Sequence, residues 1–181
     1  MQITVNRPSR DIEVITDYEI LQRLVDTYNQ IQTLRDHSDD DAGFTTEGQA
    51  SHDRVRREEL ERQLADLNAR LDSKTLVITL RGLNASQWNQ IAVKHTRIGK
   101  DRTVIKDMQA MLAEALPEMA AATRWKNGEH VDMSKDEIKT LVASMTDTQI
   151  ADVMGAMQEL NSPIASVPKA ISATLSNITR A

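Results

Sequence analysis

Cysteine is absent from the 181 residues of this chain, and aromatic residues make up only 3% of it. Without cysteine, the chain forms neither disulfides nor thiolate metal sites. Because aromatic side chains are so few, the core must be built from Leu, Ile, Val, Ala and Met, a mixture that favours helices over a β-sandwich. The composition therefore predicts a mainly α-helical protein.

Long apolar runs and an excess of positive charge are also lacking. No segment approaches the roughly 20 consecutive apolar residues needed to span a bilayer, and residues 1–10 lack the apolar run of a secretory signal. The net charge of −5 argues against a general binder of the phosphate backbone. We expect no membrane or nucleic-acid partner and a place in the cytosol of the cell that makes the protein.

Apolar residues at helical spacing predict two helices between residues 17 and 73. Those of the first helix are Ile20, Leu21, Leu24, Tyr28, Ile31 and Leu34. Those of the second are Leu60, Leu64, Leu67 and Leu71, which alternate four and three residues apart. The segment between them, 37–50, is polar and contains Gly43 and Gly48, so it is expected to be a loop. Each apolar seam needs the other to leave water, which predicts an antiparallel hairpin.

The next segment, Thr75-Leu-Val-Ile-Thr-Leu80, is β-branched and is followed by Gly82. It predicts a single strand whose partner is residues 12–15, residues 3–5 or a neighbour in an oligomer. From Asn84 onward the pattern predicts helices alone. One opens at Asn84 or Ser86, one covers 102–122, one starts at a Ser134–Glu137 capping box, and the last runs from 146 or 147 to 161.

Together these patterns predict a mainly α fold. An extended segment (1–16) is followed by the antiparallel helical hairpin (17–73). One short strand pair with a C-terminal multi-helix bundle (74–161) comes next, and a flexible, conditionally helical tail (162–181) ends the chain. The tail has no acidic residue, and its apolar stripe stays folded only if something covers it. We therefore predict partner contacts at Ile164, Val167, Ile171, Leu175 and Ile178. Trp125 stands in a polar stretch, where it is either an interface anchor or a core residue.

No motif for catalysis, a cofactor or a metal is present. The four histidines lack the i, i+3 or i+4 spacing of a zinc site. The acidic loop that starts at Asp36 matches some calcium-ligand positions of an EF-hand, but Asp41 replaces the required glycine and Phe44 also breaks the pattern. Residues 134–161 suggest a helix-turn-helix pair, yet 147–161 contain no Lys or Arg, which excludes a DNA-reading helix. The sequence predicts a protein that is not an enzyme and has no cofactor or metal.

The order of features from residue 73 to about 176 resembles the tail assembly chaperones of long-tailed (siphovirus-type) actinobacterial phages and prophages. A charged helix ends in the strand and basic turn 71–81, and Trp88 is followed seven residues later by His95. The capped pair 134–150 comes next, and Leu160-Asn161 precedes Val167-Pro168 and a tail of small residues. The chain departs from the family at Thr96-Arg97, where a Pro pair is usual, and at Ile150, where an aromatic residue is common.

The resemblance implies a non-enzymatic protein that binds the tape-measure protein, and also a candidate contact with the tail tube protein. Such chaperones keep the tape measure soluble in the host cytoplasm while the tail tube polymerises, and they are generally absent from the mature virion. Two alternatives stay open: a structural head–tail or tail protein retained in the particle, and a generic helical adaptor. The sequence also leaves open whether the chain forms a homo-oligomer.

Overall fold

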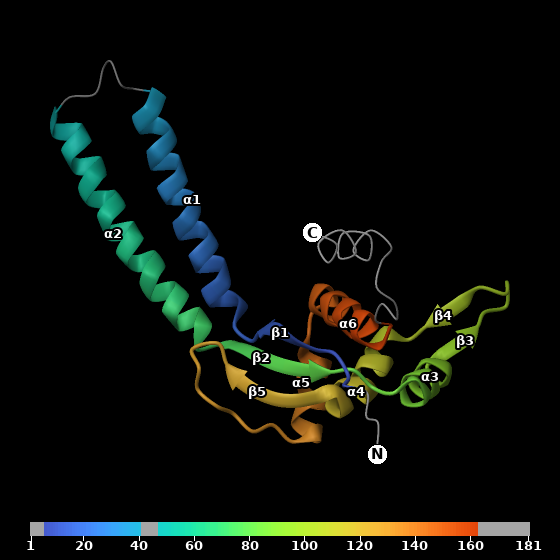
Figure 1. Ribbon diagram of the computed structural model, residues 1–181. Coiled ribbons are helices and arrows are strands. Elements are labelled where there is room, and N and C mark those ends of the chain that lie inside the picture. Colours follow the sequence, from blue (N-terminus) through green and yellow to red (C-terminus); the bar gives the residue numbers. More distant parts are fainter. Residues whose placement is uncertain (1–5, 41–46, 163–181) are drawn as a thin grey trace, which may run out of the picture. The chain divides into compact units, whose positions relative to one another are not determined.

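A computed structural model describes residues 6–40 and 47–162, which are mostly helical with a small antiparallel sheet (Figure 1). In chain order the elements are β1 (Ser9–Ile15), α1 (Tyr18–Asp40), α2 (Glu47–Asp72), β2 (Thr75–Arg81), α3 (Ala85–Lys94), β3 (Thr96–Ile98), β4 (Val104–Lys106), α4 (Met108–Met119), β5 (Ala120–Trp125), α5 (Lys135–Ser144) and α6 (Asp147–Asn161). A mainly α fold is thus confirmed.

The described chain divides into two compact units. The hairpin unit comprises residues 11–78 and 122–133, and the helical unit comprises the residues before 11, 79–121 and those from 134 onward. Strands β1, β2 and β5 form one sheet in the order β1-β2-β5, and each has residues in both units. The predicted pairing of 75–80 with 12–15 is confirmed, while residues 3–5 lie outside the described chain.

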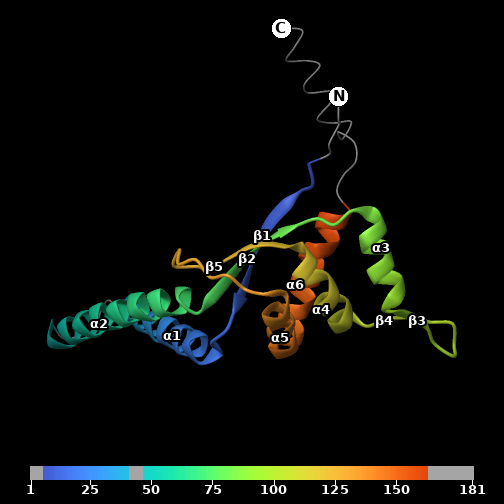
Figure 2. The ribbon, with the colours of Figure 1, turned by 90° about the horizontal axis from the view of Figure 1, so that it is seen from below.

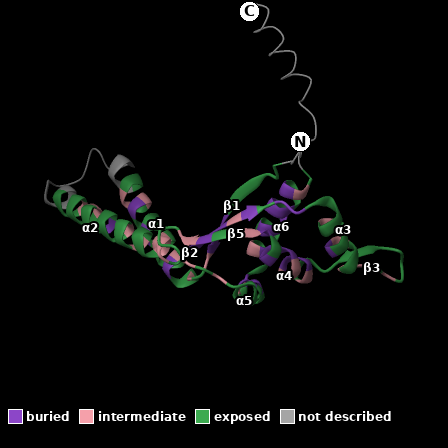
Figure 3. Cartoon of the chain, turned by 60° about the horizontal axis from the view of Figure 1, so that its bottom comes forward, coloured by how far each residue is buried: buried purple, intermediate pink, exposed green. Residues whose placement is uncertain are grey.

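The hairpin unit is built on two helices that pack along each other, as predicted. Asp17 caps α1, because its Oδ1 accepts hydrogen bonds from the backbone N–H of Glu19 and of Ile20, each at 3.1 Å. Ile20, Ile31 and Leu60 are buried in the seam, whereas Leu64, Leu67 and Leu71 are half-buried. A two-helix seam is narrow, so its flanks stay in contact with water (Figure 3).

Tyr28 does not lie in this seam, contrary to the sequence pattern. Its exposed fraction is 49%, while Thr27 beside it is 8% exposed. The Thr27 hydroxyl donates to the Arg23 carbonyl at 2.8 Å, which satisfies the polar group and lets the side chain leave water. The buried face of α1 is therefore offset by one residue from the predicted pattern, so that Thr27 is buried and Tyr28 is exposed.

The helical unit has a core of leucine, valine, isoleucine and methionine from α4, α5 and α6. Helix α4 packs against α3, α5 and α6, and its Leu112, Ala115 and Leu116 are fully buried. Five methionines lie in the core, which agrees with their expected role as core residues: Met111, Met119, Met145, Met154 and Met157.

The prediction of helices alone after Asn84 is wrong. Residues 96–98 and 104–106 form the antiparallel ribbon β3–β4, and 120–125 form β5, so there is more than one strand pair. The expected helix over 102–122 shortens to 108–119. Asp107 caps it by accepting from the Ala110 N–H at 3.0 Å, and Pro117 lies in its last turn. Val104 and Ile105 are β-branched, and the turn before them lets them pair with β3.

The predicted starts of the other helices are confirmed. Asn84, Ser134 and Thr146 are the N-caps of α3, α5 and α6, and each forms a capping box with the residue three positions later. Helix starts follow from side-chain oxygens within one turn, so local sequence determines them.

Candidate partner-binding groove

An open groove lies between α3, α4 and α5 of the helical unit, with a volume of about 480 Å³. Its floor is apolar and consists of Leu83, Ile91 and Pro117. Its walls are polar and consist of Gln87, Gln90, Lys94, Glu114, Glu118, Lys135 and Lys139. We call this set of residues the helix groove. An apolar floor with a polar rim is the usual composition of a protein-binding surface.

The α3 wall follows from helical spacing. Asn84 Oδ1 accepts from the Gln87 N–H at 2.8 Å and fixes the first turn of the helix. From there Gln87, Gln90, Ile91 and Lys94 stand at i, i+3, i+4 and i+7, which places them on one face of the helix. Ile91 turns into the floor and is 7% exposed, while the other three remain in contact with solvent.

Leu83, at one end of the floor, is held by the last residue of α6. Its backbone N–H donates to Asn161 Oδ1 at 2.7 Å. The Asn161 Nδ2 in turn donates to the Met157 carbonyl at 2.8 Å and lies 3.5 Å from Met119 Sδ. One amide side chain therefore ties the start of the groove to α4 and α6.

Glu114 joins α4 to the end of α3. Its Oε2 accepts from Lys94 Nζ at 2.7 Å and lies 2.6 Å from His95 Nε2. The hydrogen bond from Lys94, and then the one from His95, hold the pKa of the Glu114 carboxyl below its ordinary value. Beside this pair the Thr96 hydroxyl donates to the Ala92 carbonyl at 2.5 Å, so its proton is engaged by the backbone. The cluster thus braces α3 against α4 rather than activating that hydroxyl.

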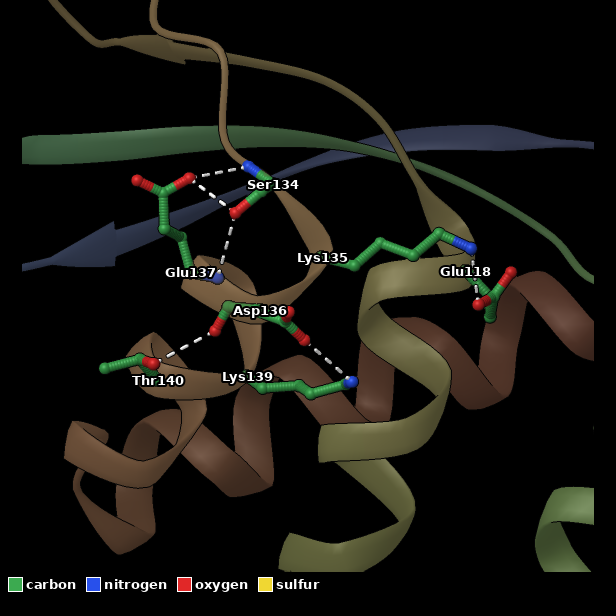
Figure 4. Close-up of polar contacts among 7 residues, drawn as sticks. All are labelled: Glu118, Ser134, Lys135, Asp136, Glu137, Lys139 and Thr140. Carbon is green, nitrogen blue, oxygen red and sulfur yellow. Dashed lines mark hydrogen bonds and ion pairs between the residues drawn. The ribbon is translucent and has the colours of Figure 1, made fainter.

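The α5 wall begins at the Ser134 capping box (Figure 4). Glu137 Oε2 accepts from both the N–H and the hydroxyl of Ser134 at 2.7 Å, and the hydroxyl contact is the main cause that lowers the pKa of Glu137. Lys135 Nζ then donates to Glu118 Oε1 at 2.6 Å, which links α5 to α4 across the groove wall. Lys139, one turn later, donates to Asp136 at 3.1 Å.

A larger groove of about 610 Å³ follows the face of the hairpin in the other unit. Leu67 is the one apolar residue among those that line it, and the rest are polar or charged. Two ion pairs lie along it, Arg62–Glu59 at 2.8 Å and Arg70–Asp66 at 3.9 Å. Such a surface is well solvated and offers little apolar area to a partner, so the helix groove is the better candidate.

The predicted contact residues fall elsewhere. Ile164, Val167, Ile171, Leu175 and Ile178 lie outside the described residues. Trp125 is half-buried at the end of β5, where its backbone N–H donates to the Glu129 carbonyl at 2.7 Å, and it belongs to the hairpin unit. Sequence reasoning missed the helix groove. The spacing of its α3 residues was visible, but nothing local shows that α4 and α5 face them.

Within residues 6–40 and 47–162, no helix is both long enough and apolar enough to cross a membrane. In the same part of the chain, no three His, Cys, Asp or Glu side chains come together in a way that would hold a metal ion. Compared with known protein families, curated proteins and solved structures, the chain matches none.

Proposed function

We propose that this chain is a tail assembly chaperone of a siphovirus-type phage or prophage. In this role it binds the tape-measure protein in the host cytoplasm and keeps it soluble while the tail tube polymerises, and it is absent from the mature virion. The observation that carries the proposal is the helix groove, an open surface with an apolar floor of Leu83, Ile91 and Pro117. The resemblance of residues 73–168 to such chaperones supplies the identity of the partner.

The groove chemistry favours an amphipathic helix over a small charged ligand. Lys94 and Lys135 already have carboxylate partners, Glu114 and Glu118, so these lysines do not call for an anion. An amphipathic helix can place apolar residues at i, i+3 or i+4 and i+7 on the floor, as other groove-bound helices do. The amides of the groove rim both donate and accept hydrogen bonds, which tolerates varied polar neighbours along a long partner.

The test is co-expression with a tape-measure protein of the same phage or prophage. Gln90→Trp fills the groove from an exposed position of α3, and we expect it to raise the Kd for the tape measure at least about tenfold, or 1.4 kcal/mol. Co-purification and solubility of the tape measure should fall with it. Asn89→Trp is the matched control, because Asn89 is exposed on the same helix but does not line the groove. Equal binding by both variants, with circular dichroism showing intact helices, would rule out the groove.

Because the chain has no cysteine, a single thiol can be placed at will. Gln90→Cys carrying a photo-crosslinker should form an adduct with the tape-measure protein, and Asn89→Cys should form much less. Mass spectrometry of purified virions separates the main alternative, since abundant copies in the particle would identify a structural protein instead.

The predicted tail contact is tested separately by a chain that ends at Ser162. We expect this truncation to weaken the tape-measure complex, because it removes the apolar stripe of residues 164–178. Unchanged binding would refute the tail prediction while leaving the helix groove intact.

A further inference from the structure

The β3–β4 ribbon carries three of the exposed large apolar side chains of the helical unit. Its register pairs Thr96 with Lys106, Arg97 with Ile105 and Ile98 with Val104. It extends beyond the helices in both views, and β3 packs against α3 (Figures 1 and 2). A two-stranded ribbon on its own is marginally stable in water, so a surface that covers it would stabilise it.

The faces of the ribbon carry unusually exposed apolar side chains. Ile98 and Val104 are directly opposite each other, hence on the same face, with exposed fractions of 76% and 63%. Ile105 is 42% exposed on the opposite face. In the helices that flank the ribbon in the chain, Val93 of α3 and Met108 of α4 are 75% and 47% exposed. Clustered exposed apolar groups on a soluble domain typically mark an interaction surface.

The same segment concentrates positive charge. Residues 94–107 contain five basic and two acidic residues, a net charge of +3, in a chain whose net charge is −5. The remainder of the chain therefore carries −8. A surface that binds this ribbon needs acidic groups together with apolar area.

The turn at the tip of the ribbon contains Arg102. The Gly99 N–H donates to the Thr103 carbonyl at 2.8 Å, and Arg102 N–H donates to the Gly99 carbonyl at 3.0 Å. Asp101 Oδ1 accepts from the Thr103 hydroxyl at 2.6 Å and from its N–H at 3.2 Å. Arg102 has φ of 63°, a left-handed conformation that is disfavoured for any residue except glycine. A basic residue is thus present where glycine would give the most stable turn.

The outward face of α6 has the complementary properties. Helix α6 contains three carboxylates and no Lys or Arg. Its exposed residues include Ala151 and Gly155, which are four residues apart and so share one face, and a Cβ added at Gly155 would meet no atom within 4 Å. The face already binds one guanidinium, because Arg10 forms an ion pair with Glu159.

We propose that the β3–β4 ribbon docks on the outward face of α6 of a second copy of this chain. The Ile98–Val104 pair lies on the low strip formed by Ala151 and Gly155, and the arginines of the ribbon lie beside the Asp residues of α6. This inference stands independently of the tape-measure proposal. A nucleic acid fits less well, since the remaining charge of −8 repels phosphates and phosphates give no cover to the apolar pair.

Because the ribbon and the α6 face are different surfaces, the contact is heterologous. Such contacts produce rings or open chains of subunits rather than a closed two-fold dimer. Because exposed charges contribute to this contact, self-association should weaken as the salt concentration rises from about 0.1 M to about 1 M and the screening length falls from roughly 10 to 3 Å.

The test is sedimentation velocity on the full chain over a range of concentrations at low and high salt. The ribbon variant is Ile98→Ser with Val104→Ser, and the α6 variant is Gly155→Trp. We expect each to raise the self-dissociation constant at least about tenfold. Val55→Ser, at an exposed valine of the hairpin, is the matched control and should associate like the wild type.

A mixture of the ribbon variant and the α6 variant tests whether the contact is heterologous. Each variant keeps the surface that the other lacks, so an equal mixture should form a heterodimer and nothing larger. A wild type that stays monomeric throughout at low salt overturns the proposal, as does wild-type association by either variant. Ribbon-dependent binding of a DNA duplex without self-association would assign the ribbon to nucleic acid instead. Circular dichroism of each variant excludes unfolding as the cause.

Discussion

Asn161→Ala tests the bond that positions the floor of the helix groove. The native side chain accepts from the Leu83 N–H at 2.7 Å and donates to the Met157 carbonyl at 2.8 Å. Leu83 is 9% exposed, so the truncation leaves its N–H in a site that water reaches poorly. An unsatisfied buried donor costs about 1 to 3 kcal/mol of unfolding free energy. The Met157 carbonyl is less affected, because it also lies within helix α6 and can accept from the helix backbone.

The assay exploits the two tryptophans, which lie in different units. Trp88 is on α3 of the helical unit and Trp125 is in the hairpin unit. In a Trp125→Phe background, urea unfolding followed by Trp88 fluorescence reports the helical unit alone. Asn161→Ala should lower its unfolding free energy by about 2 kcal/mol. If this unit unfolds together with the rest of the chain, the same loss lowers Tm by about 4 to 8 °C.

Gln158→Ala is the control for this experiment. It lies one turn earlier on α6 and is exposed, so its loss should change the free energy by less than about 0.5 kcal/mol. A loss at Asn161 that is no larger than the loss at Gln158 would refute the reasoning. It would mean that the Leu83 N–H finds water or another acceptor, and that the groove floor is not held by α6.

Four further predictions concern stability. Gly82→Ala should destabilise the fold by about 1 to 3 kcal/mol, because the added Cβ would lie 2.8 Å from the Leu160 carbonyl oxygen. At Gly155 the added Cβ meets nothing within 4 Å, so Gly155→Ala should stabilise the fold by about 0.5 to 1 kcal/mol. Urea unfolding measures both changes. The hydrogen bonds that lower the pKa of Glu114 contribute stability that is present above its ordinary pKa of 4.5 and lost as pH falls through the lower folded value. Glu114→Gln should therefore flatten the acid limb of a stability–pH curve, and an unchanged limb would contradict this. Arg102→Gly relieves the steric cost of the left-handed conformation at this position and should stabilise the ribbon by about 1 kcal/mol, seen as slower amide hydrogen exchange in β3 and β4.

Most helix boundaries could be predicted because their causes are local. An N-cap such as Ser134 needs only its own hydroxyl and a glutamate three residues later, so the sequence shows it directly. The hairpin likewise follows from apolar spacing in consecutive segments. At positions 27 and 28 the structure buries Thr27 and leaves Tyr28 exposed, and the Thr27 hydroxyl is satisfied by the Arg23 carbonyl.

The strands after residue 84 were not predictable in the same way. Val104 and Ile105 fit a helical stripe as well as a strand, and pairing with β3 decides between them. Strand β5 is similar, since Ala120 and the two alanines after it favour a helix by propensity. Their place in the β1-β2-β5 sheet prevails over that preference.

The scarcity of aromatic residues, the helical periods and the capping residues determined by themselves that this chain is mainly helical. They also placed most of its helix starts, because such signals act within one or two turns. Only the tertiary structure brought Leu83, Ile91 and Pro117 together as one floor and left Ile98 and Val104 uncovered on a ribbon. Those features depend on contacts between residues tens of positions apart, and side-chain packing, not local preference, sets them.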